Sequence, residues 1–265
     1  MNAVTSKDGT SIAYERMGSG PAVILVGGGI DDGSENAPLV PELADRFTVI
    51  NYARRGRGES GNTHPYAVKR EIEDIDALIA EVGGSAHLYG VSSGGALALE
   101  AAAAGSAIDR LAVYEVPYSV ADGWPPRWRE YRDTLDELLA EDRRGDAIEL
   151  FMRLAETPEP TIAYARGSEF WPGLEALAHT LAYDAACLGD ARPPTARLAT
   201  IAQPTLVATG GPHPPGAASW VLALAPAADA IAASIRQAER ETFEGQGHVA
   251  DPKTIAPLLE RFFAG

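Results

Sequence analysis

The stretch Gly90-Val91-Ser92-Ser93-Gly94 lies between two apolar segments of different character. Residues 86–91 before it predict a short buried strand, and the Ala- and Leu-rich residues 95–104 after it, closed by Gly105, predict a helix. A serine between glycines at a strand-to-helix turn is held in a strained conformation that lifts its hydroxyl out of the sheet. Small neighbours are needed there, because larger side chains would clash. Ser92 is therefore a candidate nucleophile.

The segments around this turn alternate between strands and helices. Apolar residues at helical spacing predict a helix over residues 68–82, and the turn residues before Thr10 indicate an N-terminal hairpin. Strands are predicted at residues 10–14, 22–26, 47–52 and 111–116. Strands separated by helices imply a parallel sheet with right-handed crossovers. The expected fold class is α/β, with a mostly parallel central sheet flanked by helices.

The alternation stops after Pro117. Helical periodicity then runs from about Trp124 to Ala199, with candidate helices at residues 127–139, 146–155, 159–165 and 174–185. Strands resume at residues 204–209 and 239–243, and Asp251-Pro252 is typical of the start of a last helix. We therefore expect a core domain of residues 1–117 and 201–265, interrupted by a helical insertion of residues 118–200.

Composition limits the classes of function. The 265 residues are 46% hydrophobic and 22% charged, which is ordinary for a globular protein of one domain or one domain with an insertion. The formal net charge of −15 disfavours nucleic acid and anionic membranes as partners, although an acidic surface is also simply a soluble one. A single cysteine, Cys187, excludes an intramolecular disulfide.

Location is indicated by the same composition. The first residues, Met1 to Gly9, are polar and lack the apolar core of a signal peptide. No apolar run approaches the roughly 18 residues that a membrane-spanning helix needs. We expect a cytoplasmic protein that acts on a small molecule, and the oligomeric state is not indicated.

Five histidines are available as the base for Ser92. His248 follows the last predicted strand in a glycine-flanked loop that can bend back towards the serine, and it comes late in the chain, as the order serine, acid, histidine requires. His87 starts a strand and so lies at the opposite edge of the sheet. The others lie in a loop, in the insertion and in a proline-rich turn: His64, His179 and His213. We predict His248 as the base, with an ordinary surface-loop histidine as the alternative.

Together these features resemble the α/β-hydrolase fold family, over nearly the whole chain. Residues 90–94 look like its nucleophile elbow, Val26-Gly27-Gly28-Gly29 like its oxyanion loop, and His248 like its base. Arg55-Gly56-Arg57-Gly58-Glu59-Ser60 resembles the family's RGxGxS turn, and the helical insertion occupies the position of its cap. The resemblance implies a serine hydrolase with a helical cap.

The acid departs from the commonest pattern of that family. Many members carry it in the loop after the strand that corresponds to residues 204–209, but here the loop Gly210–Pro214 has no carboxylate. Other members, such as haloalkane dehalogenases, place it at the end of the strand after the elbow helix. That strand contains Glu115, a carboxylate in an apolar stretch, where an unpaired charge would be costly.

A role as the partner of His248 would explain why Glu115 stands in an apolar strand. The alternative is a buried glutamate that is bound to backbone or to an arginine. Three other carboxylates are weaker candidates for the acid. Asp251 is better explained as a helix cap, and the other two, Asp184 and Asp190, lie in the insertion.

The glycine loop predicts an oxyanion hole. Backbone amides after a buried strand can approach a substrate oxygen without side-chain obstruction, and we expect the donors to be the amides of Gly29 and Ser93, with a flexible turn as the alternative. Gly56 to Gly61 also spells GxGxxG, but no helix opens inside it and its charged side chains would crowd a pyrophosphate. Its arginines are interpreted as structural or solvated. No metal signature is found, so neither metal nor cofactor is expected.

Tryptophans in the insertion suggest what the substrate touches. Trp124, Trp128 and Trp171 lie in it, and Trp220 lies outside it. Such residues commonly pack a cap onto its core, and some line an apolar pocket over the nucleophile. Trp124 and Trp171 are the predicted substrate-binding residues, which favours a small, largely apolar acyl or lactone substrate.

The expected reaction is hydrolysis of an ester, thioester or lactone through an acyl-enzyme, with Ser92, His248 and Glu115 as nucleophile, base and acid. Cofactor-free perhydrolysis or cleavage of a C–C bond could use the same residues. A non-catalytic small-molecule binding protein on a hydrolase scaffold is the third possibility, since the usual acid is missing.

Overall fold

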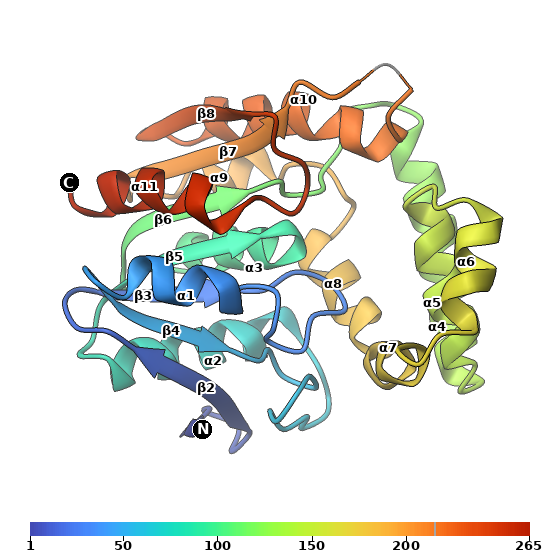
Figure 1. The fold of residues 1–265 in the computed structure, drawn as a ribbon, viewed down its shortest axis with the longest axis horizontal. Coiled ribbons are helices and arrows are strands. Elements are labelled where there is room, and N and C mark those ends of the chain that lie inside the picture. The colour runs from blue at the N-terminus through green and yellow to red at the C-terminus, as the bar shows by residue number, and fades with distance from the viewer. Residues whose placement is uncertain (215) are drawn as a thin grey trace.

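The computed structural model describes residues 1–214 and 216–265. Within them, eight strands form one sheet in the order β1-β2-β4-β3-β5-β6-β7-β8 (Figure 1). The first two pairings, β1 with β2 and β2 with β4, are antiparallel, and all later pairings are parallel. The strands are β1 (Asn2–Thr5), β2 (Ser11–Met17), β3 (Ala22–Val26), β4 (Thr48–Tyr52), β5 (Ala86–Val91), β6 (Ile108–Tyr114), β7 (Thr205–Gly211) and β8 (Ala238–Glu244). The predicted α/β fold with a mostly parallel sheet is confirmed.

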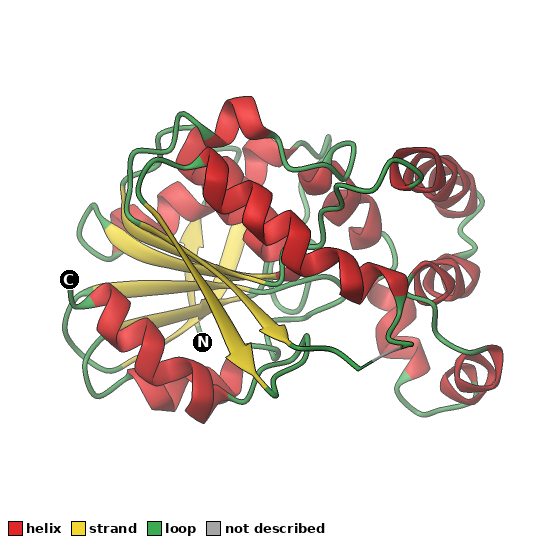
Figure 2. Ribbon diagram, turned by 90° about the horizontal axis from the view of Figure 1, so that it is seen from above, coloured by secondary structure: helices red, strands yellow, loops and turns green. Residues whose placement is uncertain are grey.

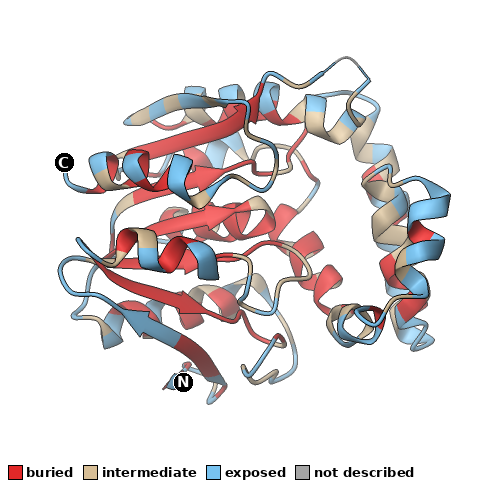
Figure 3. Ribbon diagram, in the orientation of Figure 1, coloured by how far each residue is buried: buried red, intermediate tan, exposed pale blue. Residues whose placement is uncertain are grey.

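Burial explains why the central strands read as continuous apolar runs. Residues 23–26 of β3 are fully buried, as are most residues of β5, β6 and β7, because helices cover both faces of the sheet. The predicted N-terminal hairpin is present, with Asn2 opposite Tyr14. In Figure 3 the buried residues are concentrated in these strands and in the helix after β5.

Two layers of helices enclose the twisted sheet (Figure 2). One face packs against the short helices η1 (Ala37–Leu39) and α1 (Val40–Leu43) and against α11 (Pro252–Phe263). The other face packs against α2 (Val68–Glu81), α3 (Ser92–Ala103) and α10 (Ser219–Ser234). Leu78 of α2 and Leu97 of α3 are fully buried in that second core. The helices predicted from apolar spacing therefore lie where an α/β chain needs them.

The remaining helices interrupt the alternation between β6 and β7. They are α4 (Trp124–Ala140), α5 (Arg144–Leu154), α6 (Glu159–Arg166), α7 (Trp171–Leu177), α8 (Thr180–Leu188) and α9 (Thr195–Leu198). In Figure 1, α4 to α7 stand away from the sheet, whereas α8 lies between them and α3. All six fall inside residues 118–200; the boundaries of the insertion stay a prediction.

One predicted helix is wrong in extent. Apolar spacing suggested a single helix over residues 174–185, but the chain forms α7 and α8 with a turn at Ala178 and His179. The Thr180 hydroxyl donates to the Leu177 carbonyl at 2.7 Å, which satisfies a carbonyl at the end of α7. After this break, α8 packs against α3. Among the described residues, no helix is long and apolar enough to cross a membrane.

Candidate active site

Ser92 occupies the turn from β5 into α3. Its φ of 54° lies in the left-handed region, which a non-glycine residue adopts only under strain. A β-carbon on Gly94 would come within 2.3 Å of the Gly27 carbonyl oxygen, so only glycine fits there. The close packing of Gly94 on the loop after β3 therefore brings the serine turn and the glycine loop side by side.

Glu115 follows β6 and is fully buried. Its Oε2 lies 2.9 Å from Nδ1 of His248, and its Oε1 accepts a hydrogen bond of 2.8 Å from the amide of Gly210. Both carboxylate oxygens are thus engaged, one by the backbone of β7 and the other by the imidazole. Because His248 is aligned through Nδ1, its Nε2 is left to face a reacting group.

The loop that carries His248 is held from three sides. The Tyr114 hydroxyl donates to the Gly247 carbonyl at 2.5 Å, and the Gly211 amide donates to the Gln246 carbonyl at 3.0 Å. The rings of Trp220 and His248 are perpendicular, with centroids 4.9 Å apart. The imidazole therefore sits on an ordered loop between β8 and α11.

The weaker acid candidates have other partners. The Asp251 side chain accepts from the Lys253 amide at 3.0 Å and caps α11, as its position before Pro252 indicates. Asp190 accepts from the amide of Arg192 in an exposed turn. Asp184 faces buried arginines rather than His248.

The glycine loop after β3 carries the predicted oxyanion donors. The amide of Gly28 is already taken, because it donates to Oε2 of Glu35 at 2.6 Å. Gly29 lies next, close to Ser93: a β-carbon on Gly29 would be 3.9 Å from Oγ of Ser93. The arrangement leaves Gly29 and Ser93 as neighbours at the elbow, and their role as oxyanion donors stays a prediction.

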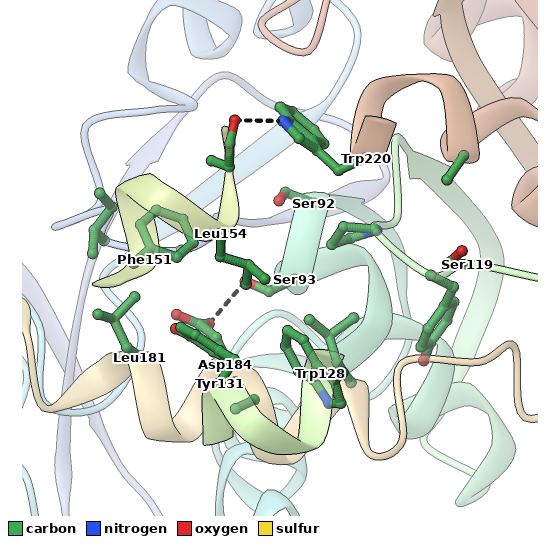
Figure 4. A pocket seen from close by; sticks show the side chains of 18 of the residues that line it. Ser92, Ser93, Ser119, Trp128, Tyr131, Phe151, Leu154, Leu181, Asp184 and Trp220 are labelled. Carbon is green, nitrogen blue, oxygen red and sulfur yellow. Dashed lines mark hydrogen bonds between the residues drawn. The ribbon is translucent and has the colours of Figure 1, made fainter. Parts of the chain in front are cut away.

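A cavity of about 340 Å³ opens above this turn (Figure 4). Ser92, Ser93, His248 and Gly29 all line it. Most of the remaining wall is apolar and comes from the insertion, with Tyr131, Phe151, Leu154, Leu181 and Leu188. The candidate catalytic groups therefore share one largely apolar compartment between the sheet edge and the inserted helices.

The two tryptophans predicted to bind substrate lie in different surroundings. Trp124 lines the cavity, but Trp171 is absent from the lining residues. Trp171 is buried among the inserted helices, where its indole N–H donates to Glu175 at 2.9 Å, and the structure gives no support for its predicted contact with substrate. Trp128 and Trp220 line the cavity instead. Trp220 could have been found from its place at the start of a core helix that follows β7.

Glu35 is a cavity residue that the motifs did not reveal. It lines the cavity with Ser92, and a β-carbon on Gly28 would lie 3.0 Å from the Ser92 Cβ and 3.1 Å from Glu35 Oε2. Burial raises the pKa of this carboxyl above its ordinary value, while the bond from the Gly28 amide opposes the shift. Its loop shows no motif, which is why the sequence did not indicate it.

The arginines of the RGxGxS-like turn are structural. Arg55 and Arg57 of this turn are buried, which agrees with the structural and not the solvated interpretation, and the preceding Arg54 is buried as well. Arg54 binds Glu71 through two hydrogen bonds of 2.7 and 2.8 Å, and Arg55 binds Asp74 in the same way. Burial alone would raise the pKa of Glu71, but the Arg54 guanidinium outweighs it and lowers that pKa.

A metal centre is not suggested either. Within residues 1–214 and 216–265, no group of three or more histidine, cysteine and acidic side chains is placed to hold an ion.

Comparison with known proteins agrees with this arrangement. The model of the alpha/beta hydrolase family matches residues 23–258. The crystal structure of an alpha/beta hydrolase from Sphaerobacter thermophilus is 49% identical, covers 99% of this chain and 100% of that one, and superposes with a TM-score of 0.87. A thermophilic esterase from Thermogutta terrifontis, 22% identical over 99% of this chain and 97% of that one, shares the fold with a TM-score of 0.70.

A curated relative matches part of the chain. Hydrolase YraK of Bacillus subtilis is 32% identical over 103 residues, which are 37% of this chain and 38% of that protein. The match therefore spans well under half of either protein. With the family model covering most of the chain, and the elbow, sheet order and inserted helices in place, the protein belongs to the alpha/beta hydrolase family and is a hydrolase.

Proposed function

We propose that the protein hydrolyses an ester, thioester or lactone of a small, largely apolar substrate through an acyl-enzyme at Ser92. The observation that carries this proposal is the 2.9 Å contact between Glu115 and His248, at the edge of the cavity that Ser92 also lines. A buried carboxylate aligned on an imidazole, beside a serine in a strained turn, is the set of groups that nucleophilic acyl transfer needs.

Each group has one task in this reaction. His248 takes the proton of the Ser92 hydroxyl as the oxygen attacks the carbonyl carbon, and Glu115 fixes the imidazole tautomer and stabilises its charge. The amides of Gly29 and Ser93 hold the oxyanion, each donor contributing on the order of 100-fold or more in rate. His248 returns its proton to the leaving group, and water activated by the same imidazole then releases the acid.

The cavity supports the substrate class. At about 340 Å³ it lies at the small end of ligand pockets, and its wall is mainly aromatic and aliphatic. Such a wall gains affinity by excluding water from an apolar acyl or lactone body, roughly 25 cal/mol for each Å² of apolar surface buried. Perhydrolysis and C–C bond hydrolysis would use the same three groups, Ser92, His248 and Glu115. Activity assays with the corresponding substrates distinguish them from ester hydrolysis.

The non-catalytic alternative rested on the missing acid after β7. That position supplies an amide instead: Gly210 N–H donates to Glu115, which in turn contacts His248. A binding protein has no need of a buried carboxylate aligned on an imidazole, since burying it costs free energy.

A fluorophosphonate probe and a panel of p-nitrophenyl esters test the proposal. Wild-type protein is expected to be labelled at Ser92 and to hydrolyse short esters, whereas Ser92→Ala loses both. Ser119→Ala is the matched control, because Ser119 lines the same cavity without contacting the imidazole pair. Labelling or full turnover that persists in Ser92→Ala would refute the nucleophile, and a folded wild-type protein that is never labelled would favour a binding function.

A further inference from the structure

One carboxylate oxygen of the inserted helix α8 gathers three donors at the floor of the cavity. Asp184 Oδ1 accepts from Ser93 Oγ at 2.8 Å, from Arg54 Nη1 at 2.8 Å and from Arg57 Nη2 at 2.7 Å. Figure 4 shows the bond between Ser93 and Asp184. Asp184 is 7% exposed and the two arginines 2% or less, so water does not compete for these bonds.

The same two arginines hold the glycine loop. Arg54 Nη1 donates to the Gly27 carbonyl at 3.4 Å, and Arg57 Nη1 donates to the Gly28 carbonyl. Asp184 therefore reaches both sides of the predicted oxyanion hole, through Ser93 on the elbow and through the arginines on the loop that leads to Gly29.

The charges of this cluster balance within the buried region. Arg54 also binds Glu71 of α2, so two guanidinium groups face two carboxylates. Removing one partner from such a set would leave an unpaired buried charge, which is strongly destabilising. Asp184 also approaches Gly29 directly, since a β-carbon on Gly29 would lie 3.3 Å from Oδ2.

We propose that Asp184 is a positioning residue that holds the amides of Ser93 and Gly29 where they can bind the oxyanion. This inference rests on the proposed function and extends it. Asp184 touches the Ser93 side chain and acts on the reaction through the backbone that it orients. Because α8 is one of the inserted helices, the bonds of Asp184 to Ser93, Arg54 and Arg57 link these helices to the predicted oxyanion hole.

The test uses Ser93→Ala, which keeps the backbone amide and removes only the hydroxyl. We expect kcat on a p-nitrophenyl ester to fall about 10-fold, a fraction of what a whole oxyanion donor supplies, while KM stays within about twofold. The affinity for phenylboronic acid, which forms a tetrahedral adduct with an active serine, should fall by the same factor as kcat.

Asp184→Asn gives the second arm. If Ser93 acts through Asp184, the two losses are not additive, and the double variant is no slower than Asp184→Asn alone. Asp74→Asn is the matched control. Asp74 lies on α2, outside the cavity, and is the buried partner of Arg55, which belongs to the same turn as Arg57. The Asp74→Asn change should therefore lower the melting temperature and leave kcat unchanged.

The outcomes separate this inference from the proposed function. Three results would each overturn the role of Asp184 in an active enzyme. They are unimpaired turnover and boronate binding in Ser93→Ala, additive losses of kcat in the double variant, and a drop in kcat for Asp74→Asn equal to that for Asp184→Asn. A folded wild-type protein that neither hydrolyses esters nor binds phenylboronic acid would overturn the proposed function, and this inference with it.

Discussion

Glu115 Oε2 and His248 Nδ1 lie 2.9 Å apart, although 133 residues separate them in the chain. The contact crosses β7, which lies between β6 and β8 in the sheet. It is possible because Gly210 near the end of β7 carries no side chain, which would collide with the Gln246 carbonyl, and because the loop after β8 pairs back onto Gly211 through Gln246.

Glu115→Gln tests the acid. A glutamine amide can donate to Nδ1 of His248, which favours the tautomer with its proton on Nε2 and prevents that nitrogen from accepting the serine proton. We expect kcat to fall by about 100- to 10,000-fold with a smaller change in KM. Steady-state kinetics on a p-nitrophenyl ester give the measurement.

Asp251→Asn is the control for that change. Asn also caps helices, so α11 keeps its start and kcat should stay near the wild-type value. The assignment of the acid would be wrong if Glu115→Gln remained fully active while Asp251→Asn lost activity.

Alanine substitution distinguishes the roles of Trp124 and Trp171. Trp124→Ala enlarges the cavity, so KM for short apolar esters should rise and longer acyl chains should become better substrates. Trp171→Ala leaves a void among the inserted helices and should lower the free energy of unfolding by about 3–5 kcal/mol. Chain-length profiles and urea unfolding measure the two effects. An altered profile in a stable Trp171→Ala protein would show that Trp171 contributes to substrate binding.

Glu35→Gln should stabilise the protein at neutral pH. Burial raises the folded-state pKa of Glu35 above 4.5, so the folded protein binds this proton more tightly than the unfolded chain does. The free energy of unfolding therefore falls as the pH rises from the pKa of Glu35 in the unfolded chain to its pKa in the folded protein. Well below pH 4.5 Glu35 is protonated in both states and has no such effect.

The advantage of Glu35→Gln is therefore expected at pH 7 to 8 and should vanish near pH 4, measured by urea unfolding at each pH. Glutamine can still accept from the Gly28 amide. Glu59→Gln, at an exposed loop position, is the control and should change little. A Glu35→Gln protein that is less stable at pH 7 would show that the charged hydrogen bond outweighs the cost of burial.

The Cys187 thiol should be inert in the folded protein. Burial, reinforced by the nearby Glu71 carboxylate, raises its pKa to about 12, so almost no thiolate is present at pH 8. We expect no reaction with dithionitrobenzoate in buffer and one reactive thiol in urea. Rapid native labelling would instead reveal opening of α8, because Cys187 lies on that helix near Arg54.

Local patterns carried most of what could be predicted. The elbow around Ser92 depends on neighbours in sequence, and the apolar run containing Glu115 marked a buried carboxylate before any partner was known. Ser92 and His248 line one cavity and Glu115 contacts His248, as predicted, while the catalytic roles of all three stay predictions. Helical spacing likewise predicted the layers around the sheet, since burial on one face imposes that spacing.

Contacts of the inserted helices with the core could not be predicted. Asp184 meets Arg54 only because α8 folds back onto α3, and apolar spacing gave no sign of the turn that allows it. Trp171 is as apolar in sequence as Trp124, but the direction of each indole is set by the packing of the inserted helices. Sequence spacing alone does not encode that direction.

Gly210 constrains how this enzyme could be altered by mutation. A β-carbon there would come within 2.3 Å of the Gln246 carbonyl oxygen and 2.9 Å of the Tyr114 hydroxyl, so no carboxylate can be installed at that position without displacing the histidine loop. The position of Glu115 after β6 therefore depends on the bare backbone at the end of β7. A side chain at Gly210 would disturb both the amide that holds Glu115 and the loop that carries His248.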